Sequence, residues 1–210
     1  MGAFEKVVFK HGAKLKKSCL LIDLPPFGES GVPLNFNIFT YTHMVICLMD
    51  KVGIKKANFI THSFGSRIGI VMSGVRRDLV SKLVIISGAG MKPRRGVRYF
   101  FKIFKAKLYR LFKIKKALGS SDYKNLSFEM KLVFKNVVNE HLEGYAKKIT
   151  AKTLLIYGDK DAETPLYMAK RLDRLIKRSR LEVLKGEGHF CFLECAFKVN
   201  RLVKSFLEEE

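Results

Sequence analysis

Three kinds of side chain that cooperate in nucleophilic catalysis each stand just after an apolar segment of this chain. In chain order they are Ser63, the pair Asp159 and Asp161, and His189. In such a set the imidazole takes the serine proton, and the carboxylate holds the imidazole in the correct tautomer and stabilises its charged form. The pattern predicts acyl transfer through Ser63. Each residue also has a structural explanation, because a serine or a Gly-Asp-x-Asp turn can cap a helix and a loop histidine can bond to the backbone.

The sequence around Ser63, Thr-His-Ser-Phe-Gly, is typical of a tight turn between a strand and a helix. The residues before it are apolar and β-prone, and Gly65 and Gly69 interrupt the apolar run after it. We expect a helix packed closely on a sheet, with Gly65 allowing the approach of helix and strand. The backbone N–H of Phe64, at the start of this helix, can then stabilise an oxyanion.

The other apolar segments alternate between strand-like and helix-like patterns. Strands are expected at 18–22, just before Ser63, and at 82–86, 153–157 and 181–184. Helices are expected at 3–16, 37–51 (capped by Asn35 or Asn37), after Ser63 to about Gly74, at 165–178, and in a final segment with Leu193, Phe197, Val199, Leu202, Val203 and Phe206 on its apolar face. This alternation indicates a parallel α/β sheet, whose active-site residues gather at the carboxyl ends of its strands.

The chain is strongly basic, with 40 lysines and arginines against 19 acidic residues and a net charge of +21. Such an excess favours anionic partners, although a solvated basic surface is an equally good explanation. No nucleic-acid-binding motif accompanies the charge, so no specific nucleic acid is expected. The cysteines, Cys19, Cys47, Cys191 and Cys195, predict buried thiols rather than a metal site. With no apolar run of 18 residues, the chain fits a cytoplasmic protein.

Four motifs together resemble those of the α/β-hydrolase fold family, in its form with a helical cap, and they cover nearly the whole chain from about Phe4. Residues 23–30 (DLPPFGES) are similar to the family's D-L-P-G-F-G-x-S loop, and 61–65 (THSFG) to its G-H-S-F-G turn. Residues 154–165 (LLIYGDKDAETP) resemble the acid-bearing L-L-I-x-G-x-x-D-x-x-x-P turn, and 188–194 (GHFCFLE) resemble the histidine loop G-H-x-x-x-x-E.

The resemblance implies Ser63 as the nucleophile, His189 as the base and Asp161 as the acid, with the N–H of Phe64 in the oxyanion hole. Asp159, on the same turn, is the second choice for the acid. The resemblance also implies a mostly parallel sheet with helices on both faces. The core would lie in two parts, residues 1–91 and 150–210, separated by a helical cap or lid at 92–149. It implies no metal and no cofactor.

The chain departs from the family pattern in three places. Thr61 stands where the tight turn around the nucleophile, the elbow, usually has glycine. Pro26 replaces a glycine of the D-L-P-G-F-G-x-S loop. The N-terminal strands and the H-G loop that supplies the second oxyanion donor are missing, and we interpret His11–Gly12 as a helix end. We therefore expect an N-terminally truncated hydrolase with a complete triad, half an oxyanion hole, low activity and marginal solubility.

The expected function is that of a serine hydrolase acting on small carboxylic esters or related acyl substrates; a peptidase or an acyltransferase would use the same triad. The alternative is a non-catalytic or weakly active relative that serves as a basic binding or membrane-surface module. Between Lys92 and Lys116 there are eleven lysines and arginines and no acid, interleaved with aromatic residues. This pattern predicts a lid helix that packs on the domain and that could also touch an anionic membrane surface. No oligomeric state is implied.

Three further residues, Asp23, His62 and Arg67, flank the expected pocket. Arg67 could pair with a buried carboxylate or orient a substrate anion, and the structural role is favoured because a buried charge must be compensated. Strand alternation points His62 away from Ser63, so we expect it to be a packing residue.

Overall fold

The computed structural model describes residues 18–25, 27, 29–31, 36–94, 136–137 and 139–209. The expected helix at 3–16, the pair His11–Gly12, Pro26 and the basic segment at 95–116 lie outside the described residues.

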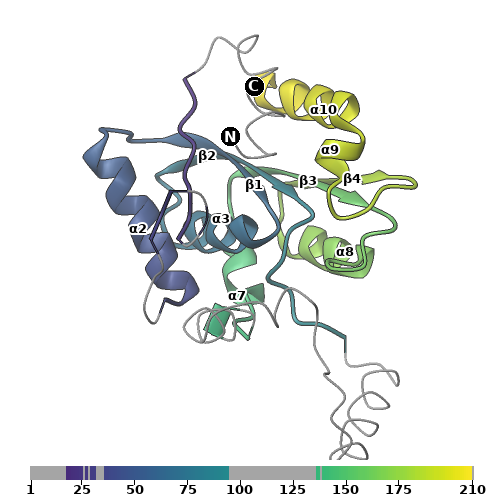
Figure 1. The fold of residues 1–210 in the computed structure, drawn as a ribbon, viewed down its shortest axis with the longest axis horizontal. Helices are drawn as coiled ribbons and strands as arrows, with labels where there is room; N and C mark the ends of the chain where they lie inside the picture. Colours follow the sequence, from purple (N-terminus) through teal and green to yellow (C-terminus); the bar gives the residue numbers. More distant parts are fainter. Residues whose placement is uncertain are drawn as a thin grey trace, which may run out of the picture.

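A four-stranded parallel sheet forms the centre of the described molecule (Figure 1). Its strands are β1 (Ala57–His62), β2 (Val80–Ile86), β3 (Lys152–Gly158) and β4 (Ser179–Leu184), which lie side by side in chain order. Each neighbouring pair is parallel. The expected α/β fold class is therefore confirmed, and all four carboxyl ends lie at one edge of the sheet.

Side chains of the two central strands alternate between two apolar clusters, one on each face of the sheet. Leu83, Ile85 and Leu155 belong to one cluster, whereas Val84 and Leu154 belong to the other. Because successive strand residues point to opposite faces, a strand buried on both sides must be apolar throughout. This explains why β2 and β3 were recognisable as apolar runs.

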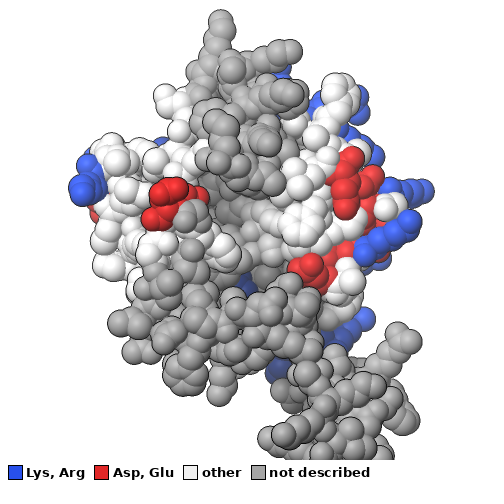
Figure 2. All heavy atoms as spheres, viewed as in Figure 1, with Lys and Arg blue, Asp and Glu red and all other residues white. Residues whose placement is uncertain are grey.

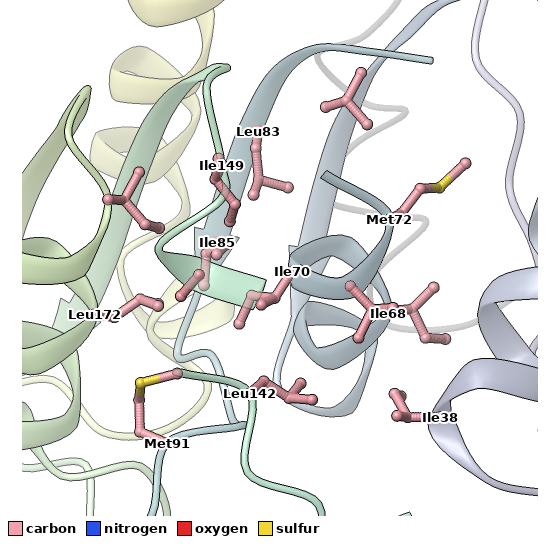
Figure 3. Close-up of a cluster of buried hydrophobic side chains, with 14 of the residues drawn as sticks. Ile38, Ile68, Ile70, Met72, Leu83, Ile85, Met91, Leu142, Ile149 and Leu172 are labelled. Atoms are coloured by element: carbon pink, nitrogen blue, oxygen red, sulfur yellow. The ribbon is translucent and has the colours of Figure 1, made fainter. Parts of the chain in front are cut away.

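Helices cover both faces of the sheet (Figure 1). The larger cluster is closed by α2 (Ile38–Lys51), α3 (Phe64–Val75), α7 (Glu143–Ala146) and α8 (Leu166–Leu175), and Figure 3 shows how their side chains meet those of β2. The smaller cluster is closed by α9 (Cys191–Glu194) and α10 (Ala196–Glu208). Asn37 caps α2, since its side chain accepts a hydrogen bond from the N–H of Thr40.

The expected buried strand at 18–22 is wrong. These residues have no regular secondary structure, and Leu20 is 45% exposed. An apolar run becomes a strand only where its N–H and C=O groups pair with a neighbour, and among the described residues β1 pairs with β2 alone.

The expected final helix is two helices, because the chain leaves helical geometry at Cys195 (φ −126°, ψ 45°). The first piece, α9, is tied to the preceding loop, since the Glu194 carboxylate accepts a hydrogen bond from the N–H of Gly188 (3.0 Å). The second, α10, packs against the sheet through Val199, Val203 and Phe206. Phe197, two positions before Val199, faces away and is 79% exposed, so its assignment to the apolar face was also wrong.

Two smaller corrections concern a helix end and the cysteines. The helix expected to reach residue 178 ends at Leu175, and Ile176 is already extended. Cys19 and Cys47 are exposed rather than buried: Cys19 lies in the segment without regular secondary structure, and Cys47 lies on the exposed face of α2. Only Cys191 is buried. In the part of the chain that the structure describes, no helix has the length and apolar character needed to cross a membrane.

Candidate active site

Ser63 occupies a strained turn between β1 and α3. Its backbone has φ 47° and ψ −111°, a positive φ that non-glycine residues seldom adopt. The turn is fixed from the sheet side, because the N–H of Ser63 donates to the carbonyl of Ile86 (3.1 Å) and its carbonyl accepts from the N–H of Ala89 (3.2 Å). The residue therefore projects its hydroxyl from a rigid turn at the carboxyl edge of the sheet, as the sequence predicted.

The helix after this turn approaches the sheet at Gly69, not at Gly65. A Cβ at Gly69 would lie 3.0 Å from Thr61 Cγ2 and 3.2 Å from Leu83 Cδ1, whereas a Cβ at Gly65 would meet nothing within 4 Å. The structural role given to Gly65 was therefore wrong. Thr61 is accommodated, because its methyl group packs over Gly69 and its hydroxyl donates to the carbonyl of Val84 (2.9 Å).

The loop after β3 holds the carboxylate of Asp161 with several donors. Oδ1 accepts the N–H groups of Glu163 (2.9 Å) and Thr164 (2.8 Å), and Oδ2 accepts the Thr164 hydroxyl (2.7 Å). Burial alone would raise the pKa of Asp161, but the hydrogen bonds from Thr164 and His189 outweigh it and lower the pKa below its ordinary value. Asp161 is therefore a buried and ionised carboxylate.

The loop after β4 is brought against the Asp161 loop by a glycine and an aspartate. A Cβ at Gly158 would overlap the carbonyl oxygen of Glu187, so this close approach requires glycine. Asp159 accepts a hydrogen bond from the N–H of Gly186 (2.7 Å). Asp159 thus joins the two loops, and its carboxylate bonds to backbone rather than to His189.

His189 joins Ser63 and Asp161 through its two ring nitrogens. Nδ1 lies 2.9 Å from Asp161 Oδ2, and Nε2 lies 2.9 Å from Ser63 Oγ. Because an ionised carboxylate can only accept, Nδ1 carries the proton and Nε2 accepts the hydrogen bond from the serine hydroxyl. The structure thus brings together the three residues singled out from the sequence, in the geometry that nucleophilic activation of a serine requires.

Comparisons with known proteins show the family of this chain. The family model described as alpha/beta hydrolase fold matches residues 2–139, more than half of the chain. This chain belongs to the α/β-hydrolase fold family. A second family model, described as TAP-like protein, matches residues 135–210 of this α/β hydrolase.

Two relatives and one solved structure indicate what the hydrolase is similar to. An uncharacterized hydrolase of Bacillus subtilis (strain 168), YugF, is 28% identical over 203 residues, which cover 83% of this chain and 74% of the relative. A 2-hydroxy-6-oxononadienedioate/2-hydroxy-6-oxononatrienedioate hydrolase of a Pseudomonas species is 26% identical in an alignment 220 residues long, gaps included. The alignment covers 90% of this chain and 76% of the relative. A meta-cleavage product hydrolase from Pseudomonas fluorescens IP01 has the same fold, with a TM-score of 0.64 at 22% identity over 86% of this chain and 76% of that one.

His62 supports the histidine loop of the hydrolase. Its Nε2–H donates to the carbonyl of His189 (3.1 Å), and its ring centroid lies 4.6 Å from that of Phe192 and 4.9 Å from that of His189. Burial lowers the pKa of His62 to about 4, so the ring is neutral near pH 7. His62 is a packing residue, as expected, but it also holds the backbone of His189, which strand alternation alone did not predict.

The N–H of Phe64 is available at the elbow, because the first N–H groups of a helix have no partner within it. The Phe64 ring lies 5.1 Å from Tyr41 and 6.3 Å from Phe27, measured between centroids. Tyr41 also donates its hydroxyl to the carbonyl of Pro25 (2.6 Å). The aromatic side chains therefore hold the loop around Pro25 beside the Ser63 turn.

Arg67 has the structural role that we favoured. Its Nη1 donates to the carbonyls of Val137 (2.8 Å) and Glu140 (2.9 Å), and the side chain is buried. The guanidinium thus attaches the backbone at Val137 and Glu140 to α3. It does not face the reacting groups.

Sequence reasoning missed the position of Glu163. One of its carboxylate oxygens lies 3.4 Å from Nε2 of His189, the nitrogen that also faces Ser63. The only signal in the sequence was an additional acid two residues after Asp161. Within the described ranges, no group of three or more His, Cys, Asp or Glu side chains is arranged to hold a metal ion.

Proposed function

We propose that this chain is a serine hydrolase that cleaves carboxylic esters or related acyl substrates through Ser63, His189 and Asp161. The observation that carries the proposal is the continuous hydrogen-bonded path from Ser63 Oγ through the two nitrogens of His189 to Asp161 Oδ2, with both distances 2.9 Å. A capping serine or a structural histidine would not require this alignment of three side chains from three separate loops.

The reaction follows from which atoms face one another. Ser63 Oγ attacks the acyl carbon, and its proton passes to Nε2 of His189. The carbonyl oxygen becomes an oxyanion, towards which the N–H of Phe64 is directed. Nε2 then protonates the leaving alcohol oxygen as the C–O bond breaks, which leaves an acyl group on Ser63. Water repeats the sequence and releases the acid.

Asp161 supports the positive charge that forms on His189. Its lowered pKa keeps it ionised at neutral pH, and three donors besides His189 fix its orientation. A carboxylate held in this way keeps the imidazole proton on Nδ1, so Nε2 stays free to accept from Ser63. Every step uses groups of this chain and water.

The substrate class rests on the relatives. One of them is named for oxo-dienedioate and trienedioate compounds, which are small dicarboxylates. This supports the size of the substrate proposed for this chain, a small molecule, and not its charge. A peptidase or acyltransferase would share the acyl-enzyme step, and the acceptor that releases the acyl group distinguishes these activities.

We also propose that the segment 92–149 carries a cap between two core parts, 1–91 and 150–210, although its last helix, α7, packs in the larger core cluster. The position of the insertion supports this division. Because β2 and β3 are parallel neighbours, the chain between them leaves the sheet at its carboxyl edge and must return to the opposite edge to begin β3. The chain leaves the sheet at the carboxyl end of β2. This strand lies next to β1, which leads into the Ser63 turn (Figure 1). A segment inserted there can cover Ser63.

Labelling with a fluorophosphonate probe tests the function directly. We expect the wild-type chain to be labelled at Ser63, and Ser63→Ala to abolish both labelling and ester turnover. Ser205→Ala, which removes an exposed serine on α10, serves as the matched control and should behave as the wild type. Absence of labelling in a chain whose circular dichroism shows it to be folded would reject the enzyme and favour a non-catalytic binding module.

A further inference from the structure

Glu163 places a negative charge beside the reacting nitrogen of His189. The residue follows Asp161 by two positions, and its N–H donates to Asp161 Oδ1 (2.9 Å), which fixes its backbone. Its side chain is 66% exposed, and Oε2 lies 3.4 Å from Nε2 of His189. The same Nε2 lies 2.9 Å from Ser63 Oγ, so the carboxylate borders the space where an acyl group must react.

The two segments that carry Asp161 and His189 are acidic, whereas the whole chain is basic. Residues 159–165 and 185–195, which follow β3 and β4, hold five acids and two lysines in a chain of net charge +21. Figure 2 shows acidic side chains on the right of the face drawn, with basic side chains next to them. Three of these five carboxylates, those of Asp159, Asp161 and Glu194, accept hydrogen bonds from the backbone. The Glu163 carboxylate instead faces Nε2.

The near charge outweighs the distant ones for a bound substrate. Salt screens charges over about 8 Å at physiological ionic strength, so lysines spread over the surface act weakly on the reacting carbon. A carboxylate within a few ångström of a bound anion is screened far less, and a like-charge contact of this kind weakens binding by about tenfold or more.

We propose that Glu163 is a specificity-determining residue that selects neutral and cationic acyl groups and discriminates against acyl groups carrying a carboxylate or phosphate. The inference rests on the serine-hydrolase function proposed above. It predicts that the substrate preference opposes the charge of the whole protein: anions are attracted to the surface of the chain but disfavoured at Ser63.

Three p-nitrophenyl esters of equal acyl length test the proposal: the neutral pentanoate, the glutarate half-ester with a terminal carboxylate, and a 4-(trimethylammonio)butanoate. For the wild type we expect kcat/KM for the neutral ester to exceed that for the anionic ester by about tenfold or more. Glu163→Gln, which keeps the shape and removes the charge, should reduce this ratio by about tenfold, and Glu163→Lys should invert it. Added salt should move the ratios of the wild type and of Glu163→Lys towards that of Glu163→Gln.

Glu208→Gln is the matched control, because Glu208 is an exposed acid remote from the carboxyl edge of the sheet. It lies at the end of α10, and this end of the helix contacts Lys82 near the start of β2. The control variant should leave all ratios unchanged. A Glu163→Gln ratio within twofold of the wild-type value, with turnover that still depends on Ser63, would overturn the inference alone. Turnover that is absent, or that survives Ser63→Ala, would instead reject the proposed function and the inference with it.

Discussion

The turn that carries Ser63 and the loop that carries His189 are held in place by different interactions. The Ser63 turn is fixed by backbone hydrogen bonds to Ile86 and Ala89 and by the packing of Thr61 on Gly69. The loop of His189 is held by a single backbone bond from the Asp161 loop, in which the N–H of Lys160 donates to the carbonyl of Glu187 (3.0 Å), and mainly by polar side chains, which bond to the N–H groups of Gly186 and Gly188 and to the carbonyl of His189.

This difference follows from the position of each segment in the fold. A turn between a central strand and a buried helix inherits the rigidity of the core, and that rigidity maintains its positive φ. A loop at the edge of the sheet has little apolar surface to bury, so its conformation depends on individual hydrogen bonds. Changes at the elbow should therefore affect stability and activity together, whereas changes near the histidine loop should mainly affect activity.

The largest effect is expected for Asp161→Asn. The asparagine amide carries no charge, so it cannot hold the proton on Nδ1 of His189 as the Asp161 carboxylate does. We expect kcat to fall by about 1000- to 10,000-fold, with a small loss of stability. Asp159→Asn, a matched change on the same turn, should lower kcat less than tenfold, because Asp159 bonds to the N–H of Gly186. Ester hydrolysis rates of the two variants decide the matter, and similar losses in both would contradict the separate roles of the two aspartates.

A medium effect is expected at the elbow, from alanine at Gly65 and at Gly69, two of the three glycines of α3. Gly69→Ala should have a free energy of unfolding about 1–3 kcal/mol lower than that of Gly65→Ala, because only its Cβ meets Thr61 and Leu83. Urea unfolding measures the difference. Adding Thr61→Ser to Gly69→Ala removes the methyl group in contact and should restore part of the loss. Equal stability of the two alanine variants would show that packing at Gly69 does not hold the elbow.

The smallest effect is expected at His62, which bridges the two regions. His62→Phe keeps an aromatic ring against Phe192 but removes the donor to the carbonyl of His189, and should lower turnover by up to about tenfold. His62→Asn loses the ring and should lower stability more than turnover. Parallel measurements of kcat and of urea unfolding separate the two roles, and a fully active His62→Phe would leave His62 with packing alone.

The lowered pKa of His62 adds a dependence of stability on pH. The ring has a pKa of about 4 in the folded chain against 6.5 ordinarily, so the folded state favours the neutral form. Its contribution is complete above about pH 6.5 and is lost as the pH falls towards 4. Because the ring is only half-buried, we expect a loss of about 1–2 kcal/mol over this window. The loss should be absent in His62→Phe, and an unchanged pH profile in that variant would contradict it.

The sequence by itself determined the order of the elements and the three residues that meet in the site. The apolar runs of β2, β3 and the elbow strand are local patterns, and Asn37 is a local helix cap; both are set by backbone geometry within a few residues. Ser63, Asp161 and His189 could be aligned because each stands at the end of a recognisable strand. The resemblance to the α/β-hydrolase family then selected Asp161 over Asp159.

Only the tertiary structure decided which atoms those segments bring into contact. It places Asp161 on His189 and Asp159 on the neighbouring loop, and it makes Gly69 rather than Gly65 the point of close approach. It also sets Glu163 beside Nε2 of His189. These facts depend on how far the loops after β3 and β4 extend and how their backbones bond to each other. Such contacts join residues far apart in the chain, so no local pattern of residue types contains them.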